Sequence, residues 1–188
     1  MALVAECSLE SVSPISFSRP YRTEKLSKES HADYETRTWR ERLHYDENGM
    51  VFIPPMAFKL GIAECARYLG IKIPGRGASK YTKHFESGIL VLEGLPLGVH
   101  KDAVQSEELF VPSDGIPGSS KRVYKTFAIV PEWKGTVKFY ILDRTITKEV
   151  FEEHLREFGR FIGIGRWRPA NRGLKGRFSV KKIAWSED

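Results

Sequence analysis

Apolar residues between positions 56 and 69 recur at the spacing of an α-helix. Pro54 and Pro55 precede this run and Gly70 follows it, so we expect a helix that begins near Met56 and ends at Gly70. The predicted apolar face consists of Met56, Leu60, Ala63, Ala66 and Leu69, widened by Phe58, Ile62 and Cys65.

A second helical pattern follows position 147. Thr147 is a favourable N-cap, and Glu149 in the first turn suits the positive end of the helix dipole. The apolar stripe of this predicted helix is formed by Val150, Phe151, Leu155, Phe158 and Ile162.

Shorter apolar or alternating runs, bounded by turn-forming residues, predict strands. Asn48-Gly49 indicates a tight turn between a strand at 38–45 and one at 50–53. The remaining stretches at 18–37, 71–85 and 93–106 are expected to be irregular. The other predicted strands are 7–17, 89–92, 108–111, 122–130, 136–142 and 176–185.

Without the irregular stretches, the order of elements is β-α-β…β-α-β. This order predicts an α+β, ferredoxin-like or RRM-like core with long insertions. We therefore expect one RRM-like domain over 1–188, with an extension at 18–53 and irregular insertions at 71–120.

Composition narrows the function classes. The 188 residues are 41% hydrophobic, with a net charge of +6 and only two cysteines, Cys7 and Cys65. Neither a disulfide framework nor a metal-binding cysteine spacing is present. The start of the sequence lacks the pattern of a signal peptide, and no apolar run reaches the roughly 20 residues of a membrane span. We expect a cytoplasmic protein that does not bind membranes.

The positive charge is concentrated near the end of the chain. Between Glu157 and Glu187 there are eight basic residues and no acidic one. The other 22 of the 30 basic residues face 24 acidic residues, so the rest of the chain is slightly acidic. A local cationic cluster of this kind is typical of a polyanion site.

The cationic cluster is interleaved with glycines and one tryptophan, Trp167. In one interpretation the glycines let a phosphodiester backbone approach, arginines bind phosphates and Trp167 stacks on a base. In the other, the segment is an ordinary helix-to-strand connection with a solvated basic surface. A dinucleotide fingerprint does not fit, because it needs a strand before the glycines and a helix after them, and here the order is reversed. A Walker loop does not fit, because the sequence has no Gly-Lys-Ser or Gly-Lys-Thr.

The segment Gly163-Ile164-Gly165-Arg166, followed by Gly173-Leu174-Lys175-Gly176-Arg177-Phe178, resembles the C-terminal glycine-rich loop of the RAMP superfamily of CRISPR-associated proteins. A second similarity lies at 52–59, Phe-Ile-Pro-Pro-Met-Ala-Phe-Lys, which resembles the start of the first helix in RAMP backbone subunits. Lys59 is the one residue of this motif to which the resemblance assigns a role in RNA binding. The two similarities together concern about half of the chain.

The resemblance implies an RNA-binding backbone-type subunit that grips the phosphates of a guide RNA. It also implies a homo-oligomer along RNA, or other subunits of a nucleoprotein complex, as partners, and a thumb supplied by 18–53. The candidate RNA-binding residues are Lys59, Arg76, Lys80, Lys83, Arg166, Trp167, Arg168, Arg172, Lys175 and Arg177.

Two alternatives stay open at this point. The superfamily includes guide-processing endoribonucleases, and His84 is the one histidine in a basic context, although no acid/base partner is evident. Asp33, Asp46 and Asp114 are loop aspartates that more simply fit turns, so the sequence assigns no catalytic residue, metal or cofactor. The second alternative is a standalone mobile-element protein that binds or mimics a subunit of a nucleoprotein complex.

Overall fold

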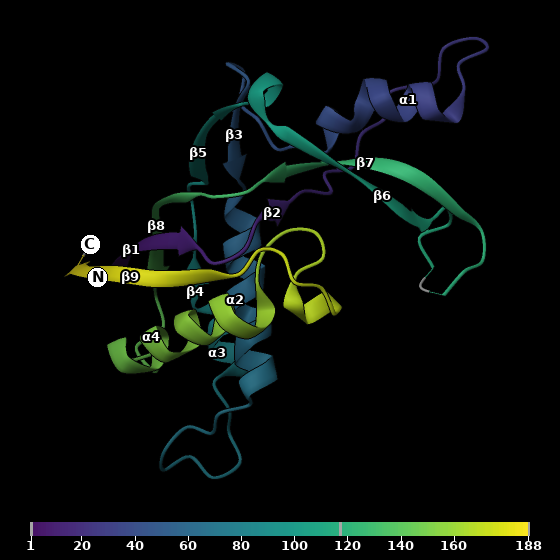
Figure 1. Cartoon of the computed structure of the whole chain (residues 1–188). Helices are drawn as coiled ribbons and strands as arrows, with labels where there is room; N and C mark the ends of the chain where they lie inside the picture. The colour runs from purple at the N-terminus through teal and green to yellow at the C-terminus, as the bar shows by residue number, and fades with distance from the viewer. Residues whose placement is uncertain (1, 117, 188) are drawn as a thin grey trace.

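A computed structural model of the chain describes residues 2–116 and 118–187. Its main sheet is antiparallel, with the strand order β4-β8-β1-β9. In Figure 1, helix α2 (Pro55–Leu69) runs vertically through the middle of the view, and helix α4 (Lys148–Glu157) lies below β9. The four strands are β1 (Leu3–Ser11), β4 (Ile89–Leu90), β8 (Lys134–Ile141) and β9 (Phe178–Glu187).

Phe139 of β8 organises the core between sheet and helices. Its ring lies 6.2 Å from that of Phe58 on α2 and 5.2 Å from that of Phe151 on α4. Because one strand side chain points to one face only, both helices cover the same face of the sheet. The opposite face is polar, with Glu6 and Lys138 exposed between the buried positions of their strands.

The six core elements follow in the order β1-α2-β4-β8-α4-β9. The predicted α+β ferredoxin-like class is therefore confirmed. Gly70 ends α2 in the left-handed conformation, with φ 59°, and the Thr147 side chain caps α4, as the sequence predicts.

The predicted apolar face of α2 is partly wrong. Met56 and Leu60 are 54% and 60% exposed, whereas Phe58 and Ile62 are fully buried. Gly61 explains this rotation, because a Cβ atom there would lie 2.2 Å from the ring of Phe158. The helix therefore turns the side of Phe58, Gly61 and Ile62 towards the core.

The sequence misplaced several strand boundaries. The single strand predicted at 7–17 is divided at Pro14 into β1 and β2 (Ile15–Ser16), and β2 joins a different sheet. The stretch 93–106, expected to be irregular, contains β5 (Leu95–His100) and η2 (Lys101–Ala103). Strand β5 pairs with β3 (Met50–Ile53), and α3 (Thr82–Ser87) begins within the stretch 71–85.

A long hairpin is formed by β6 (Gln105–Pro112) and β7 (Arg122–Val130). In Figure 1 it reaches away from the main sheet to the right, and β2 completes its three-stranded sheet in the order β2-β7-β6. Its outer part exposes Phe110 and Tyr124, which are directly opposite each other with ring centres 4.9 Å apart.

The strand predicted at 38–45 is wrong, and so is the prediction that 18–37 is entirely irregular. Helix α1 (His31–Thr38) continues into η1 (Trp39–Arg42), and only Tyr45 bridges to Val51. The Ser30 side chain caps α1 by accepting a hydrogen bond from the backbone N–H of Asp33, at 3.1 Å.

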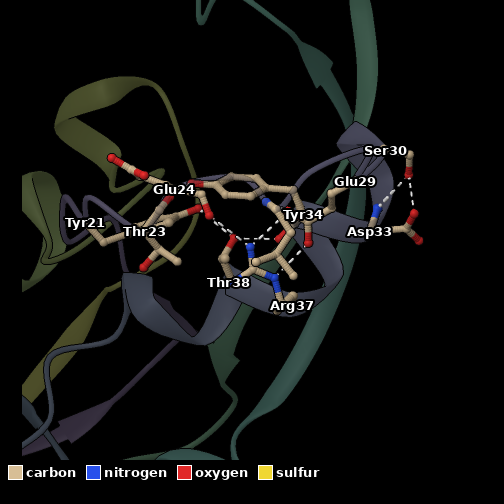
Figure 2. Close-up of polar contacts among 10 residues, drawn as sticks. Tyr21, Thr23, Glu24, Glu29, Ser30, Asp33, Tyr34, Arg37 and Thr38 are labelled. Carbon is tan, nitrogen blue, oxygen red and sulfur yellow. Dashed lines mark hydrogen bonds and ion pairs between the residues drawn. The ribbon is translucent and has the colours of Figure 1, made fainter.

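The segment before α1 is folded back onto that helix (Figure 2). Arg37 donates to both carboxylate oxygens of Glu29, at 2.7 and 2.9 Å, and to the backbone oxygen of Glu24. The Tyr34 hydroxyl donates to the backbone oxygen of Thr23 at 2.7 Å. These contacts order a stretch whose polar sequence predicted a loop.

Candidate nucleic-acid interface

The glycine-rich loop, residues 163–177, is folded into a pair of adjoining arms. The backbone N–H of Ile164 donates to the oxygen of Gly176 at 2.9 Å, and that of Lys175 donates to Trp167, also at 2.9 Å. The arms are also held from outside, because Arg166 donates through its backbone N–H to Ser16 at 2.8 Å. Three cross-links of this kind give the loop a defined shape.

Its glycines are required by the protein's own backbone. A Cβ atom at Gly173 would lie 1.7 Å from the Trp167 oxygen, and one at Gly176 would lie 1.7 Å from the Ile164 oxygen. A Cβ at Gly165 would lie 2.3 Å from the Ser16 oxygen. Close packing inside the loop therefore accounts for these glycines without a nucleic acid.

Acidic residues from other elements neutralise part of the cationic cluster. Arg168 forms an ion pair with Glu64 of α2 at 2.8 Å, and the Lys175 ammonium pairs with Glu107 of β6. Arg160 pairs with Glu157 at 2.8 Å and Lys181 with Glu10 at 3.2 Å. The sequence did not predict these ion pairs. Their acidic residues either lie far from the cationic cluster along the chain or come just before it.

Arg166 and Trp167 are packed at the base of the β6–β7 hairpin. The Arg166 guanidinium lies 4.5 Å from the ring centre of Phe127, and the Trp167 ring meets the same Phe127 edge-on at 4.5 Å. Burial lowers the pKa of Arg166, and the nearby Arg42 lowers it further, although Glu35 opposes this. Both side chains thus help to attach the loop to the hairpin.

Arg166, Arg172 and Arg177 are the loop cations that have no ion-pair partner among the described residues, and Arg166 is packed against Phe127 and Trp167. Arg172 is exposed and adopts a left-handed conformation, with φ 62°. Arg177 is half-buried, and its Nε hydrogen-bonds to no atom in residues 2–116 or 118–187. Because aromatic rings of the protein cover Arg166, we take Arg172 and Arg177 as the loop cations most open to an anion.

Lys59 has a contact inside the protein. Its ammonium donates to the backbone oxygens of Phe85 and Glu86, at 3.1 and 2.5 Å, at the end of α3. Burial lowers the pKa of this amine, although Glu86 opposes the effect. This geometry explains Lys59 as a cap of α3.

The structure does not bring Arg76, Lys80 and Lys83 to the glycine-rich loop. All three are exposed. The first two lie on the connection that follows α2, which Figure 1 shows projecting at the bottom, well away from the loop. The ten candidate residues therefore do not form one continuous surface, and their RNA-binding role stays a prediction.

His84 has an acidic hydrogen-bond partner that was not evident from the sequence. Its Nδ1 lies 2.6 Å from a carboxylate oxygen of Asp143, between β8 and α4. Burial opposes ionisation of Asp143, yet the hydrogen bonds from His84 and from the backbone N–H of Thr145 lower its pKa overall. The two side chains are about one-quarter exposed, at 26% and 27%.

The loop aspartates occupy turns and a helix start. Asp46 accepts hydrogen bonds from the backbone N–H groups of Asn48 and Met50, both at 2.9 Å, and Asp114 accepts one from Ile116 at 3.0 Å. Asp33 takes part in the cap of α1. Within the described ranges, no group of three or more His, Cys, Asp or Glu side chains gathers as a metal site, and no helix has the length and apolarity of a membrane span.

An exposed aromatic pair that the sequence did not predict lies beside the loop. Tyr68 of α2 and Phe161 of η3 (Phe158–Ile162) have ring centres 5.7 Å apart and are 61% and 40% exposed. Both line a cleft of about 560 Å³ together with Pro169, Ala170 and Arg177. Helical spacing did not predict that these two residues are exposed. For Phe161 the reason is that it lies in a π-helical turn, which shifts it away from the regular helical period.

No model of a known protein family matches the sequence, and no curated protein is significantly similar to it. Solved structures do match. A chain in the cryo-EM structure of type III-B Cmr-beta bound to cognate target RNA superposes with a TM-score of 0.58 at 11% identity, over 98% of this chain. The chain shares its fold with this chain of the Cmr-beta complex.

This chain spans 60% of the length of that Cmr-beta chain. A second match, Cmr6 from Pyrococcus furiosus, covers 96% of this chain and 100% of the Cmr6 chain, with 15% identity and a TM-score of 0.48. The similarity to the Cmr-beta chain concerns the arrangement of the whole fold.

Proposed function

We propose that this protein is an RNA-binding subunit of a CRISPR-type ribonucleoprotein, of the backbone type that holds guide RNA. The observation that carries the proposal is the ordered loop in a RAMP-like fold, which presents Arg172 and Arg177 without ion-pair partners in the described part of the chain. Guanidinium groups on a preformed loop bind phosphates with little loss of conformational freedom.

The β6–β7 hairpin supports the same proposal. It projects beside the loop, and Lys175 and Glu107 connect the two by an ion pair. Exposed Phe110 and Tyr124 on the hairpin offer faces on which bases can stack, and Arg122 lies 5.3 Å from the Phe110 ring centre. We assign the thumb-like role to this hairpin and α1 together, in place of 18–53 alone.

The test is a salt titration of binding to a labelled single-stranded RNA, followed by fluorescence anisotropy. Each phosphate contact contributes about 0.7 to the slope of log K against log salt for single strands. Arg172→Gln should weaken binding and reduce the slope by about that amount. Unchanged affinity and slope would remove Arg172 from the interface, and absence of binding by the unmodified protein at low salt would end the proposal.

Lys28→Gln is the matched control. Lys28 is an exposed cation with the same φ of 62° as Arg172, but it lies in the segment before α1. Each of the two substitutions removes one exposed positive charge from a residue with the same φ, so the two variants are compared at equal net charge. Binding by the Lys28 variant should match that of the unmodified protein.

The His84–Asp143 pair favours a second candidate function, metal-independent cleavage of guide precursor RNA. A carboxylate that accepts a hydrogen bond from one imidazole nitrogen orients the other nitrogen for proton transfer. Incubation of purified protein with labelled repeat RNA in a chelator tests this. Cleavage that disappears in His84→Ala supports it, whereas intact RNA after prolonged incubation with the unmodified protein rules it out.

A further inference from the structure

Tyr68, Phe161 and Arg160 form a row of neighbouring groups on the surface, in which the two rings are tilted to each other. The Arg160 guanidinium lies 5.1 Å from the Phe161 ring centre, and the Phe161 ring lies 5.7 Å from that of Tyr68 at an interplanar angle of 33°. Tyr68 is the most exposed aromatic member, at 61%. Large aromatic rings that are this accessible and already in contact with each other present a preformed surface for stacking.

These rings border a defined hollow. Its volume of about 560 Å³ lies within the range of roughly 300–1,000 Å³ typical of small-ligand sites. Pro169 and Ala170 of the glycine-rich loop line it with the two rings. Phe161 and Arg177 also line a smaller neighbouring hollow of about 180 Å³, so the two depressions share a border.

Arg177 gives the cleft an unsatisfied donor. Its backbone N–H donates to the Ser13 hydroxyl at 3.0 Å, which fixes its position. Its side-chain Nε is shielded from solvent and bonds to no atom in the described ranges. Arg177 lines the cleft, and its guanidinium has no ion-pair partner in the described ranges, so it suits a ligand that supplies an oxygen or ring nitrogen as acceptor.

The acidic residue on the cleft wall is neutralised. Glu64 lines the cleft, but its carboxylate pairs with Arg168 at 2.8 Å. Arg67, also on the wall, forms an exposed ion pair with Glu86 at 2.8 Å, so Arg177 is the wall cation without an ion-pair partner in the described ranges. The cleft therefore combines aromatic faces with cationic donors, which suits an anionic ligand with planar rings.

We propose that this cleft binds one unstacked nucleobase of a single-stranded RNA. The base stacks on Tyr68 with Phe161 behind it, and Arg177 donates to an acceptor of that nucleotide. This inference rests on the proposed function, because the strand that lies across Arg172 supplies the nucleotide. It extends that function by adding a contact to a base to the contacts with phosphates.

The experiment compares a single-stranded RNA with an oligonucleotide of the same length whose bases are absent. Tyr68→Ala should weaken binding to the complete RNA about tenfold, a typical loss for one stacked base. The salt slope should not change, since no charge is removed. The variant and the unmodified protein should bind the abasic strand equally, and Tyr68→Phe should retain full affinity.

Leu92→Ala is the control, because Leu92 is 63% exposed, almost as much as Tyr68, and is not among the residues that line the cleft. Equal losses in the Tyr68 and Leu92 variants would overturn the inference, since they would indicate a general effect of lost apolar surface. Thermal unfolding of each variant confirms that the folded protein is compared.

The two proposals fail in different ways. If the unmodified protein binds neither strand at low salt, the proposed function fails and the inference falls with it. If it binds RNA with a normal salt slope but Tyr68→Ala binds equally well, only the inference is overturned. In that case the exposed Tyr68–Phe161 surface would instead fit contact with a protein partner.

Discussion

Arg168 of the glycine-rich loop and Glu64 of α2 form an ion pair with 2.8 Å between the guanidinium and the carboxylate. Their side chains are 22% and 34% exposed, so solvent screens the pair only in part. The pair joins the loop to the first core helix and also lowers the positive charge that the loop presents.

Replacement of Glu64 by Gln should increase affinity for RNA. The change removes a negative charge from the cleft and releases Arg168 for a phosphate contact, so the salt slope should steepen by about 0.7. Anisotropy titrations at several salt concentrations measure both quantities. Glu47→Gln, in an exposed turn, controls for the change in net charge. An unaltered slope in the Glu64 variant would show that Arg168 does not reach RNA.

Gly173→Ala should distort the loop without changing its charge. The added methyl group would overlap the Trp167 backbone oxygen, so we expect a loss of at least about 1–3 kcal/mol in the free energy of unfolding. Binding to RNA should weaken as well. Urea denaturation measures the first effect.

Gly75→Ala is the comparison, because a methyl group at this position would have no atom within 4 Å and only the strain of its φ of 74° applies. That strain costs about 1–2 kcal/mol. If both alanine variants lose the same stability, the close approach at Gly173 has no additional effect.

Burial of His154 should make the protein less stable in mild acid. The side chain is fully buried, its ring stacks on Phe85 at 4.2 Å, and its Nδ1–H donates to the Val150 oxygen at 2.7 Å. Burial lowers the pKa of His154 below the ordinary value of about 6.5, although the hydrogen bond to Val150 opposes this. Below that value the unfolded chain binds a proton that the folded protein resists, so stability falls as the pH falls.

Urea denaturation of the unmodified protein at pH 7.5 and 5.5 should therefore give a lower midpoint at pH 5.5. His154→Phe keeps a stacked ring but does not titrate, so its midpoint should depend less on pH. Some dependence should persist, because burial also lowers the pKa of His44. The same pH dependence in both proteins would contradict the assignment to His154.

The contacts around α1 predict a strongly acidic carboxyl group. The hydrogen bonds from Arg37 lower the pKa of Glu29 to about 2. Arg37→Gln should return this pKa towards the ordinary value of about 4.3, measured by NMR titration of the carboxyl carbon. Lys25→Gln, which removes a weaker and more distant influence, should change it little. A pKa near 4 in the unmodified protein would show that the ion pair does not form in solution.

Local sequence signals predicted those parts of the fold that depend on neighbouring residues. Gly70 and Thr147 mark helix ends through backbone conformation and capping, and both predictions are confirmed. The buried face of α2 depends instead on Gly61, which accommodates a phenylalanine almost 100 positions later. Helix α1 was missed because its few buried groups, such as Thr38, acquire their contacts only through the hairpin and the preceding segment.

In the candidate site, too, local features could be predicted from the sequence and long-range contacts could not. The sequence indicated which residues of the loop are cationic, and these residues do lie on one ordered loop. It did not indicate that Glu64 and Glu107 would neutralise two of them, since those acids come from a helix and a strand far away in the chain. For the same reason it did not reveal the Tyr68–Phe161 pair, whose members are brought together by the packing of α2 against η3.

Strand β1 lies between β8 and β9 in the main sheet, and Leu3 is opposite both Ile141 and Glu187. During synthesis the earliest residues of the sheet must therefore wait for partners made more than a hundred positions later. Until 178–187 have left the ribosome, β1 keeps an open edge that can pair with other chains. We expect the nascent protein to depend on chaperones until that moment, and folding to be slow compared with that of helical proteins of this size.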